Sequence, residues 1–372
     1  MGWQPPWPAV MKMVVASRHS SSSSVVLGGC CLSAASAIIR QAGPQVNGVV
    51  RTLTTTCDIL RQSGHRVEVI SPDQYPSVPC PTYPEIRLAL TMPGTVGRRL
   101  AKLQPDAVHI ATEGPLGLSA RRYCMTKAVP FTTAYHTQFP DYVARRTSLP
   151  SDAFWPYIRW FHRPAQRVMV ATESIREELR AQGLTRLHHW GRGVDLELFH
   201  PDAGACADYE GLRRPIQLYV GRVAVEKNLE AFLKTSQPGT KVIVGDGPAR
   251  SDLEVRYPDA VFLGKRGGED LARCYADADV FVFPSKTDTF GLVMIEALAC
   301  GTPVAAYPVP GPRDILTDEV GAMSENLDEA IAAAPSRDSQ ACAEFGKAFS
   351  WEAATAQFLA GLEEFDGECL TP

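Results

Sequence analysis

Short apolar runs alternate with longer amphipathic segments along most of the chain. An apolar run of about four to eight residues between polar turns predicts a buried strand, and apolar positions three and four residues apart predict a helix. In the first half, this pattern predicts strands at 66–71, 106–111, 130–135 and 167–171, and helices at 49–63, 95–103, 116–128, 151–167 and 174–182. A proline-rich segment that reaches Pro84 is expected to be a loop.

The same alternation restarts near residue 216. The second half is predicted to contain strands at 216–220, 241–244, 260–263, 280–284 and 303–308, and helices at 227–234, 250–257, 269–276 and 291–300. A last helix is predicted at 352–365. Strands that alternate with helices at this spacing need right-handed crossovers, so each half is expected to form a parallel, doubly wound sheet.

The break between the two halves carries Gly, Pro and Asp without periodicity, which is typical of a linker. The predicted organisation is an atypical N-terminal segment at 1–43, a first Rossmann-like domain at 44–192, a linker at 193–214, a second Rossmann-like domain at 215–350, and a closing helix and tail at 351–372. The fold class is therefore α/β, with two domains expected to face each other across a cleft. Ligands of such sheets bind at the carboxyl ends of the strands.

Length and composition agree with this organisation. A chain of 372 residues exceeds what one hydrophobic core usually serves, so two domains are expected. The net charge of -4 argues against nucleic acid as the main partner. The ten cysteines form no CxxC pair and are scattered along the chain, which favours reduced thiols in a cytoplasmic protein.

The N-terminal segment is unusual. An apolar run at 25–39 follows a serine tract and two basic residues, and in this it imitates a signal peptide, although it is too short for a membrane span. Export conflicts with the cytosolic chemistry suggested by the rest of the chain. We therefore expect an atypical or wrongly started N-terminus, in which 11–17 resembles a strand.

The strongest chemical signal is a pair of acidic residues, Asp288 and Glu296, directly after the strand predicted at 280–284. The helix that begins at Phe290 and Gly291 offers free backbone N–H groups to an anion. Carboxylates repel phosphate, so their natural partners are sugar and ribose hydroxyls. The alternative is that both acids only cap or solvate the start of the helix.

The second signal is a loop that carries two cations after the strand at 216–220. Arg222 can grip phosphate oxygens with two N–H groups, and Lys227 adds a point charge. Such a pair suits a diphosphate when no metal ion neutralises it, and the chain has no DxD-like metal pair there. Simple surface cations would be disfavoured at a helix start. The turn at Gly245 and Gly247 permits close approach of the backbone to a ligand, but such turns are common.

Two positions in the first half are further candidates. Gly48 lies in a turn that runs into a helix, which is a site suited to an anion. His136 follows the strand predicted at 130–135, at the edge where ligands of doubly wound sheets bind. A lone histidine is equally well explained as a structural residue.

Four segments carry a family resemblance: PQVNGVVRTL, GRVAVEKN, GDGP and FPSKTDTFGLVMIEALACGTPV. They resemble the retaining glycosyltransferases of family 4, in the subgroup of bacterial GDP-mannose-dependent mannosyltransferases and of sulfoquinovosyl and glucosyl diacylglycerol synthases. The resemblance covers the chain from about Pro44 and implies a GT-B fold, with an acceptor-side first domain and a donor-binding second domain.

The resemblance also implies residue roles. Glu296 would bind the ribose hydroxyls, Asp288 the donor sugar, and Arg222 with Lys227 the diphosphate. Gly48 would bind phosphate through its backbone, and His136 would lie beside the donor sugar. The remaining donor-binding positions are Gly221, Gly245, Gly247, Lys265, Arg266, Phe290, Gly291 and Leu292, with Lys265 and Arg266 near the base.

The implied reaction is metal-independent transfer of a hexosyl group from GDP-mannose or a UDP-hexose to a hydroxyl acceptor, without a cofactor and by front-face substitution. The acceptor is expected to be a membrane lipid or glycolipid, with a soluble or polysaccharide acceptor as the alternative. A non-hydrolysing nucleotide-sugar epimerase shares the fold and is a rival, as is an inactive binding protein, which would be expected to lose the acids or the cations.

Basic and aromatic residues near 145–167 bear on the acceptor. The arginines are Arg145, Arg146, Arg159, Arg163 and Arg167, and the aromatic residues are Trp155, Tyr157, Trp160 and Phe161. Together they would form a membrane-facing surface, placing a cytoplasmic enzyme on the inner face of the membrane. The alternative is that the aromatic residues belong to the core and the arginines face solvent.

The chain departs from the family in two places. Residues 33–43 stand where relatives have a strand and a short loop before the PQxNG turn, and 11–17 resembles the missing strand. This suggests that 18–43 is an insertion or that the start is corrupted. The first acid of the pair is Asp288, where many relatives have Glu, so its contact with the sugar would be shorter or bridged by water.

Overall fold

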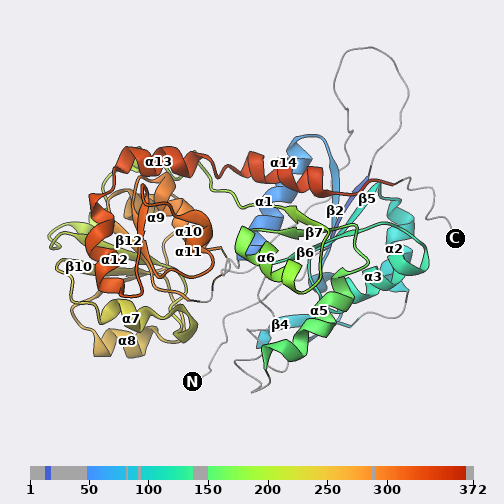
Figure 1. The fold of residues 1–372 in the computed structure, drawn as a ribbon, viewed down its shortest axis with the longest axis horizontal. Coiled ribbons are helices and arrows are strands. Elements are labelled where there is room, and N and C mark those ends of the chain that lie inside the picture. Colours follow the sequence, from blue (N-terminus) through green and yellow to red (C-terminus); the bar gives the residue numbers. More distant parts are fainter. Residues whose placement is uncertain are drawn as a thin grey trace, which may run out of the picture. The chain divides into compact units, whose positions relative to one another are not determined.

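The computed structural model describes residues 13–17, 48–80, 83–90, 94–136, 150–286, 288 and 290–365. The chain divides into two compact units (Figure 1). Unit 1 is drawn from Met1–Ala171, Ile175–Gly191 and Ala354–Pro372, and unit 2 from Thr172–Ser174 and Arg192–Ala353. Each unit has its own sheet, as the restart of the alternation predicts.

The described part of unit 2 contains a six-stranded parallel sheet. Its strands are β9 (Ile216–Val220), β10 (Thr240–Val244), β11 (Val261–Gly264), β12 (Val280–Phe283), β13 (Val304–Ala306) and β14 (Gly321–Met323). They are ordered β11-β10-β9-β12-β13-β14, so the winding reverses between β9 and β12. Both of these strands are buried along their whole length, as expected when helices cover both faces of a sheet.

The helices of unit 2 are α7 (Leu229–Leu233), α8 (Arg250–Arg256), α9 (Gly268–Ala276), α10 (Leu292–Ala299), α11 (Pro312–Ile315), α12 (Leu327–Ala333) and α13 (Ser339–Lys347). The prediction of one helix over 227–234 is wrong at its start. A 3-10 helix covers Val225–Lys227, and Asn228 then takes a left-handed conformation with φ 55° before α7 begins. Lys227 therefore lies in the loop after β9.

The segment predicted as a linker, 193–214, packs inside unit 2. Phe199 is buried with its ring 5.8 Å from that of Tyr275, and the Tyr209 hydroxyl donates to the carbonyl of Cys274 at 2.8 Å. Short 3-10 helices at Pro201–Ala203 and Ala207–Tyr209 explain why this segment shows no strand or helix periodicity.

The sheet of unit 1 is mixed. Its strands are β1 (Met13–Ser17), β2 (Arg66–Ile70), β5 (Ala107–Ile110), β6 (Thr132–Tyr135), β7 (Arg167–Val170) and β8 (Leu187–His189), in the order β2-β1-β5-β6-β7-β8. The expected strand near 11–17 is present, but it runs antiparallel to both β2 and β5. The prediction of an all-parallel sheet is wrong at this strand. The long stretch of chain between β1 and residue 48 removes the short-loop constraint that sets strand direction in a doubly wound sheet.

Helices cover both faces of this sheet. They are α1 (Gly48–Gln62), α2 (Thr95–Leu103), α3 (Pro115–Thr126), α5 (Trp155–His162), α6 (Glu173–Ala181) and α14 (Trp351–Gly361). Val168 and Val170 of β7 share one core with α2, α3, α5 and α6, whereas Met169 between them belongs to a second core with α1 and α14. This alternation follows the two-residue period of a strand.

Two local predictions in unit 1 are wrong. The segment predicted as a loop forms a hairpin of β3 (Ser77–Cys80) and β4 (Tyr83–Ala89), whose prolines are tolerated because each strand of a two-stranded ribbon has a free edge. The single helix predicted at 151–167 is a 3-10 helix, Ser151–Phe154, followed by α5, which ends before Pro164.

Candidate active site

The two strongest sequence motifs meet in unit 2. Lys227 follows β9 and Asp288 follows β12, and these neighbouring strands flank the point where the winding reverses. The Lys227 Nζ donates to Asp288 Oδ1 at 2.6 Å and to Oδ2 at 2.8 Å. Each side chain keeps about a quarter of its surface exposed, at 26% and 25%. The reversal point is where doubly wound sheets bind their ligands, so this ion pair marks the candidate site.

The loop that carries the cations is held by its own side chains. The buried Tyr219 hydroxyl donates to the Arg222 carbonyl at 2.8 Å, and the Asn228 side-chain amide donates to the carbonyl of Pro284 at 3.1 Å, which ties the loop to the end of β12. Arg222 Nη1 donates to Glu226 Oε1 at 3.0 Å. Burial raises the pKa of Tyr219 well above its usual value, and the negative charges of Asp288 and Glu226 raise it further.

The glycines of the turn after β10 pack closely against this loop. A Cβ on Gly245 would overlap the carbonyl oxygen of Gly221, and one on Gly247 would overlap the carbonyl oxygen of Val223. The Gly245 N–H also donates to the Gly264 carbonyl at 2.8 Å. These contacts explain the glycines by the packing of one loop on another, and no ligand is needed to account for them.

Glu296 lies deeper than its motif suggests. Gly291 adopts a left-handed φ of 90° immediately before α10, and Glu296 lies on the second turn of that helix with only 3% of its surface exposed. The Tyr275 hydroxyl of α9 donates to Glu296 Oε2 at 3.0 Å, which fixes the carboxylate. Phe290 is also buried, and its ring lies 6.4 Å from that of Phe349. Leu292, the first residue of α10, is half-buried.

The residues expected near the base stand apart from the Lys227 pair. Lys265 and Arg266 follow β11, which β10 separates from β9 in the sheet. Arg266 Nη2 forms an ion pair with Asp208 Oδ2 at 3.0 Å, so its guanidinium is held by the segment predicted as a linker. The structure therefore brings Lys227 and Asp288 together and places Lys265 and Arg266 two strands away.

In unit 1, the predicted residues lie at the ends of described segments. Gly48 is the first residue of α1, and the rest of its turn, 44–47, lies outside the described residues. His136 follows β6, with its ring 5.3 Å from that of Trp190 in an edge contact. The segment after His136 that contains Arg145 and Arg146, 137–149, also lies outside the described residues.

A buried chain of polar groups in unit 1 was missed from the sequence. His162 of α5 is 1% exposed, and its Nε2 lies 3.1 Å from Glu113 Oε1 while its Nδ1 lies 2.8 Å from Thr133 Oγ1 of β6. The Tyr157 hydroxyl donates to the carbonyl of Glu113. Glu113 follows β5, so an acidic residue just after a predicted strand was the available signal. Nothing local pointed to His162, because 49 positions separate the two.

The basic and aromatic residues of α5 do not form one amphipathic face. Trp155 and Phe161 are buried at 6% and 0% exposure, whereas Trp160 is 52% exposed. Arg167 bonds to the carbonyl of Leu362 at 2.8 Å. Among the described members of this set, Arg159, Trp160 and Arg163 are exposed. No helix among the described residues combines the length and apolar character needed to cross a membrane.

Comparisons with known proteins agree with this geometry. Residues 46–198 match Glycosyltransferase Family 4, and residues 214–343 match the glycosyl transferases of group 1. A GDP-mannose-dependent alpha-mannosyltransferase of Mycobacterium tuberculosis is 35% identical over 323 residues, which are 78% of this chain and 84% of that protein. An alpha-monoglucosyldiacylglycerol synthase of Streptococcus pneumoniae is 25% identical, covering 74% of this chain and 71% of that protein.

Among solved structures, a sucrose-phosphate synthase from Thermosynechococcus elongatus superposes with a TM-score of 0.61 at 22% identity, covering 80% of this chain and 82% of that one. At this identity the likeness shows the fold alone, which is GT-B. Neither relative named above is an epimerase, so the comparisons give that rival no support. The chain belongs to glycosyltransferase family 4 and is a hexosyltransferase with the GT-B fold.

Proposed function

We propose that the protein transfers a mannose-type or glucose-type hexosyl group from GDP-mannose or a UDP-hexose to a hydroxyl of a membrane lipid or glycolipid, with retention at the anomeric carbon. The observation that carries this proposal is the bidentate contact of Lys227 with Asp288 at the reversal between β9 and β12. A sugar diphosphate presents hydroxyls next to phosphate oxygens. The carboxylate can accept hydrogen bonds from the sugar hydroxyls, and the ammonium beside it can donate to the phosphate oxygens.

The leaving diphosphate is stabilised by groups of unit 2. An ammonium has three donors, and the two oxygens of Asp288 occupy two of them, so Lys227 keeps one for a phosphate oxygen. Arg222 donates to Glu226, and its guanidinium is suited to bidentate hydrogen bonds with phosphate oxygens. The first backbone N–H groups of α10 supply further donors next to Phe290 and Gly291. Together these groups neutralise the diphosphate without a metal ion.

Retention by two successive displacements requires a carboxylate free to attack the anomeric carbon. The two acids of this site are engaged elsewhere, because Asp288 binds Lys227 and Glu296 is buried against Tyr275. This arrangement favours front-face substitution, in which the acceptor hydroxyl attacks on the side from which the diphosphate leaves. The diphosphate oxygen then takes the hydroxyl proton, and the protein aligns the reactants and stabilises the departing charge.

The lipid acceptor is supported by the Streptococcus pneumoniae relative, whose name states that it makes a glucosyldiacylglycerol. Nucleotide sugars are cytosolic, and a lipid acceptor is taken from a bilayer. An enzyme that joins the two would act from the cytoplasm on the inner face of the membrane.

A donor screen tests this function. GDP-mannose, UDP-glucose and UDP-sulfoquinovose are each incubated with a lipid extract, with a soluble oligosaccharide and with no acceptor. We expect one donor to yield a glycolipid only in the lipid arm. Product in the oligosaccharide arm alone would replace the lipid acceptor, and an altered donor sugar without any acceptor would identify an epimerase.

The metal-free mechanism has a separate test. We expect EDTA to leave turnover largely intact, since Arg222, Lys227 and α10 supply the positive charge at the diphosphate. Loss of turnover in EDTA that magnesium or manganese restores would show that a metal ion takes part.

A further inference from the structure

A buried histidine of unit 1 has no role in the reaction proposed above. His162 is the last residue of α5, and its ring contacts groups on two other segments, the Glu113 carboxylate after β5 and the Thr133 hydroxyl of β6. We call these three residues the His162 network. None of them was a candidate from the sequence, and all three lie in unit 1, apart from the pair of Lys227 and Asp288.

The partners of His162 fix the orientation of its ring. A carboxylate oxygen only accepts hydrogen bonds, so Nε2, which lies 3.1 Å from Glu113 Oε1, carries the proton and donates it. In the neutral imidazole, Nδ1 then accepts from Thr133 Oγ1 at 2.8 Å. A ring turned by 180° would present carbon atoms to both partners. The donor to Glu113 is therefore held in one direction.

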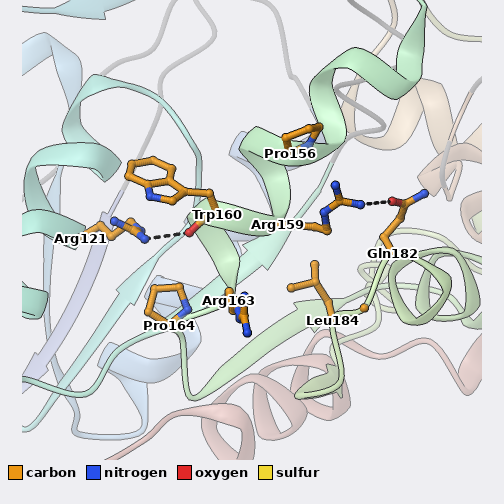
Figure 2. A pocket seen from close by; sticks show the side chains of 9 residues that line it. Arg121, Pro156, Arg159, Trp160, Arg163, Pro164, Gln182 and Leu184 are labelled. Carbon is orange, nitrogen blue, oxygen red and sulfur yellow. Dashed lines mark hydrogen bonds between the residues drawn. The ribbon is translucent and has the colours of Figure 1, made fainter.

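The end of α5 that carries His162 is anchored to its neighbours. Arg121 of α3 donates from Nε and Nη2 to the carbonyls of the two residues before His162, at 3.0 and 2.7 Å. Its guanidinium carbon also lies 3.9 Å from the centroid of the Trp160 ring. Arg159 Nη1 donates to Gln182 Oε1 at 3.0 Å, and Figure 2 shows these contacts on both sides of the helix. These bonds leave the last turn of α5 little freedom to move.

The backbone of Glu113 is held by the same helix. The Tyr157 hydroxyl of α5 donates to the carbonyl of Glu113. Burial raises the pKa of Tyr157 to about 12, and the negative charge of Glu113 raises it further, so this hydroxyl keeps its proton near neutral pH. Glu113 is therefore bound to α5 at two points, through its main chain and through one carboxylate oxygen.

The second carboxylate oxygen of Glu113 is available to a ligand. The side chain keeps 17% of its surface exposed, and none of the described residues bonds to its Oε2. Glu113 follows β5 at the carboxyl end of the strand, which is the edge where doubly wound sheets bind their ligands. A hydroxyl that reaches Oε2 would meet a hydrogen-bond acceptor whose direction is already set.

We propose that His162 is a positioning residue, which aims the Glu113 carboxylate at the acceptor hydroxyl. The inference rests on the proposed function, because it requires a hydroxyl acceptor. The His162 side chain is 0% exposed and does not touch the substrate. It acts by fixing the long Glu113 side chain before the acceptor binds, so that less conformational entropy is lost on binding.

A purely structural role of His162 makes a different prediction. A buried link between α5 and β6 would be weakened by the loss of either ring contact. Positioning depends on one contact alone, the hydrogen bond from Nε2 to Glu113. The test therefore has to separate the two nitrogen atoms of the ring.

His162→Gln and His162→Asn separate them. The amide nitrogen of glutamine reaches about as far as Nε2 and can donate to Glu113, whereas asparagine reaches only as far as Nδ1 and keeps the contact with Thr133. We expect His162→Asn to raise the acceptor KM about fivefold and His162→Gln to stay within about twofold of the parent. The donor KM, and kcat at saturating acceptor, should not change in either variant. Steady-state kinetics with the acceptor found in the donor screen measures this.

Two further variants show through which residue His162 acts. In a Glu113→Ala background, His162→Asn should raise the acceptor KM no further, because the carboxylate that it positions is gone. His109→Asn is the matched control. His109 is 1% exposed and lies 2.9 Å from Thr132 Oγ1, but none of the described carboxylates bonds to its ring. This control should keep the acceptor KM of the parent.

Equal acceptor KM values in His162→Asn and His162→Gln would overturn the proposal and leave His162 as a structural link. A further rise caused by His162→Asn in the Glu113→Ala background would also overturn it. Thermal midpoints show which variants are folded. If neither histidine variant folds, Thr133→Val takes their place, since it keeps the side-chain shape and removes only the partner of Nδ1. Its acceptor KM should rise about twofold, and an unchanged value would contradict the proposal. Turnover by the parent tests the proposed function, whereas these comparisons between variants test His162 alone.

Discussion

In each unit an acidic side chain that follows a central strand pairs with a basic side chain, and the two pairs differ in kind. In unit 2, Lys227 and Asp288 are both partly exposed, at 26% and 25%, and their loops follow adjacent parallel strands. In unit 1, His162 is fully buried while its partner Glu113 keeps 17% of its side chain exposed. The first pair joins an ammonium to a carboxylate, whereas the second joins a carboxylate to a buried imidazole that also contacts the Thr133 hydroxyl.

We infer from this difference that the site in unit 2 binds the charged diphosphate, whereas the site in unit 1 orients the neutral acceptor hydroxyl. A diphosphate needs cations, and in the proposed function Lys227 and Arg222 provide them. A hydroxyl needs a fixed hydrogen-bond acceptor, and a carboxylate braced by a buried histidine provides that. The contrast predicts that substitutions in unit 2 act on the donor and on turnover, whereas substitutions in unit 1 act on the acceptor and on the response to pH.

The largest effect is expected at Lys227. Charge on the diphosphate grows as the glycosidic bond breaks, so a cation placed there binds the transition state more tightly than the ground state. We expect Lys227→Ala to lower kcat about a hundredfold with a smaller change in the donor KM, measured by steady-state kinetics. Lys227→Met should do no better, since it keeps the shape and loses the charge.

The matched control is Lys234→Ala, which removes an exposed lysine of the same unit that pairs with Glu230 at 2.8 Å. Such a surface pair contributes little, so its kinetics should stay at the parent level. A higher donor KM with unchanged kcat in Lys227→Ala would contradict the catalytic role and leave Lys227 as a binding residue.

The next effect is expected at Glu296. Glu296→Gln keeps an oxygen for the Tyr275 hydroxyl but removes the charge that would strengthen bonds to the ribose hydroxyls. We expect the Kd of the nucleoside diphosphate, measured by calorimetry, to rise about thirtyfold, or about 2 kcal/mol. The exposed Glu344→Gln serves as the control. Parent-like affinity in Glu296→Gln would refute the ribose assignment.

The third effect is a dependence of stability on pH, which we expect from a buried histidine of unit 1. His109 of β5 is fully buried among Trp190 and Phe358, and burial lowers its pKa to about 3. The unfolded chain binds a proton near the usual pKa of 6.5 while the folded protein does not, so stability falls as pH drops from 6.5 towards 3. The loss between pH 7 and pH 5 should be about 2 kcal/mol from this residue.

We expect His109→Asn to flatten that dependence, measured as the free energy of unfolding in urea at pH 7 and pH 5. His65→Asn is the comparison, because burial lowers the pKa of His65 as well but the residue is only partly covered. An unchanged pH dependence in His109→Asn would mean that other groups cause the acid sensitivity.

The same contrast explains what the sequence could predict. Five of the six strands of unit 2, β9 to β13, were predicted to within two residues, because buried parallel strands are continuous apolar runs, whereas the short β14 was not predicted. Lys227 and Asp288 could be found because each lies in the loop after such a strand. The direction of β1 and the hairpin at β3 and β4 could not be predicted, since strand pairing is set by contacts between distant segments.

Depth of burial was the other quantity that the sequence did not contain. The motif predicted that Glu296 contacts the ligand. Its 3% exposure and the hydrogen bond from Tyr275 depend on how α9 packs against α10, which the sequence alone does not show. In α5, neighbouring aromatic residues differ completely, with Phe161 in the core and Trp160 half-exposed. Helical periodicity predicts such a difference only once the direction of the core is known.

The smallest effect is expected at Glu113. Ile110 of β5 pairs with Thr133 of β6, and Glu113 and His136 each follow their strand residue by three positions, so both lie at the carboxyl edge of unit 1. Glu113 Oε1 is held by His162, and no group in the described part of the chain bonds to Oε2. That oxygen is suited to accept a hydrogen bond from the acceptor hydroxyl.

We expect Glu113→Gln to raise the acceptor KM about fivefold, or about 1 kcal/mol, while the donor Kd stays unchanged, because the change exchanges one charge-assisted hydrogen bond for a neutral one. Kinetics with the acceptor found in the donor screen would measure this, with exposed Glu177→Gln of α6 as the control. If Glu113→Gln instead lowered only the melting temperature and left the acceptor KM alone, the pair with His162 would be a structural link between α5 and the loop after β5. The two units would then still differ in the groups that form their acid–base pairs, but the pair in unit 1 would not bind the acceptor.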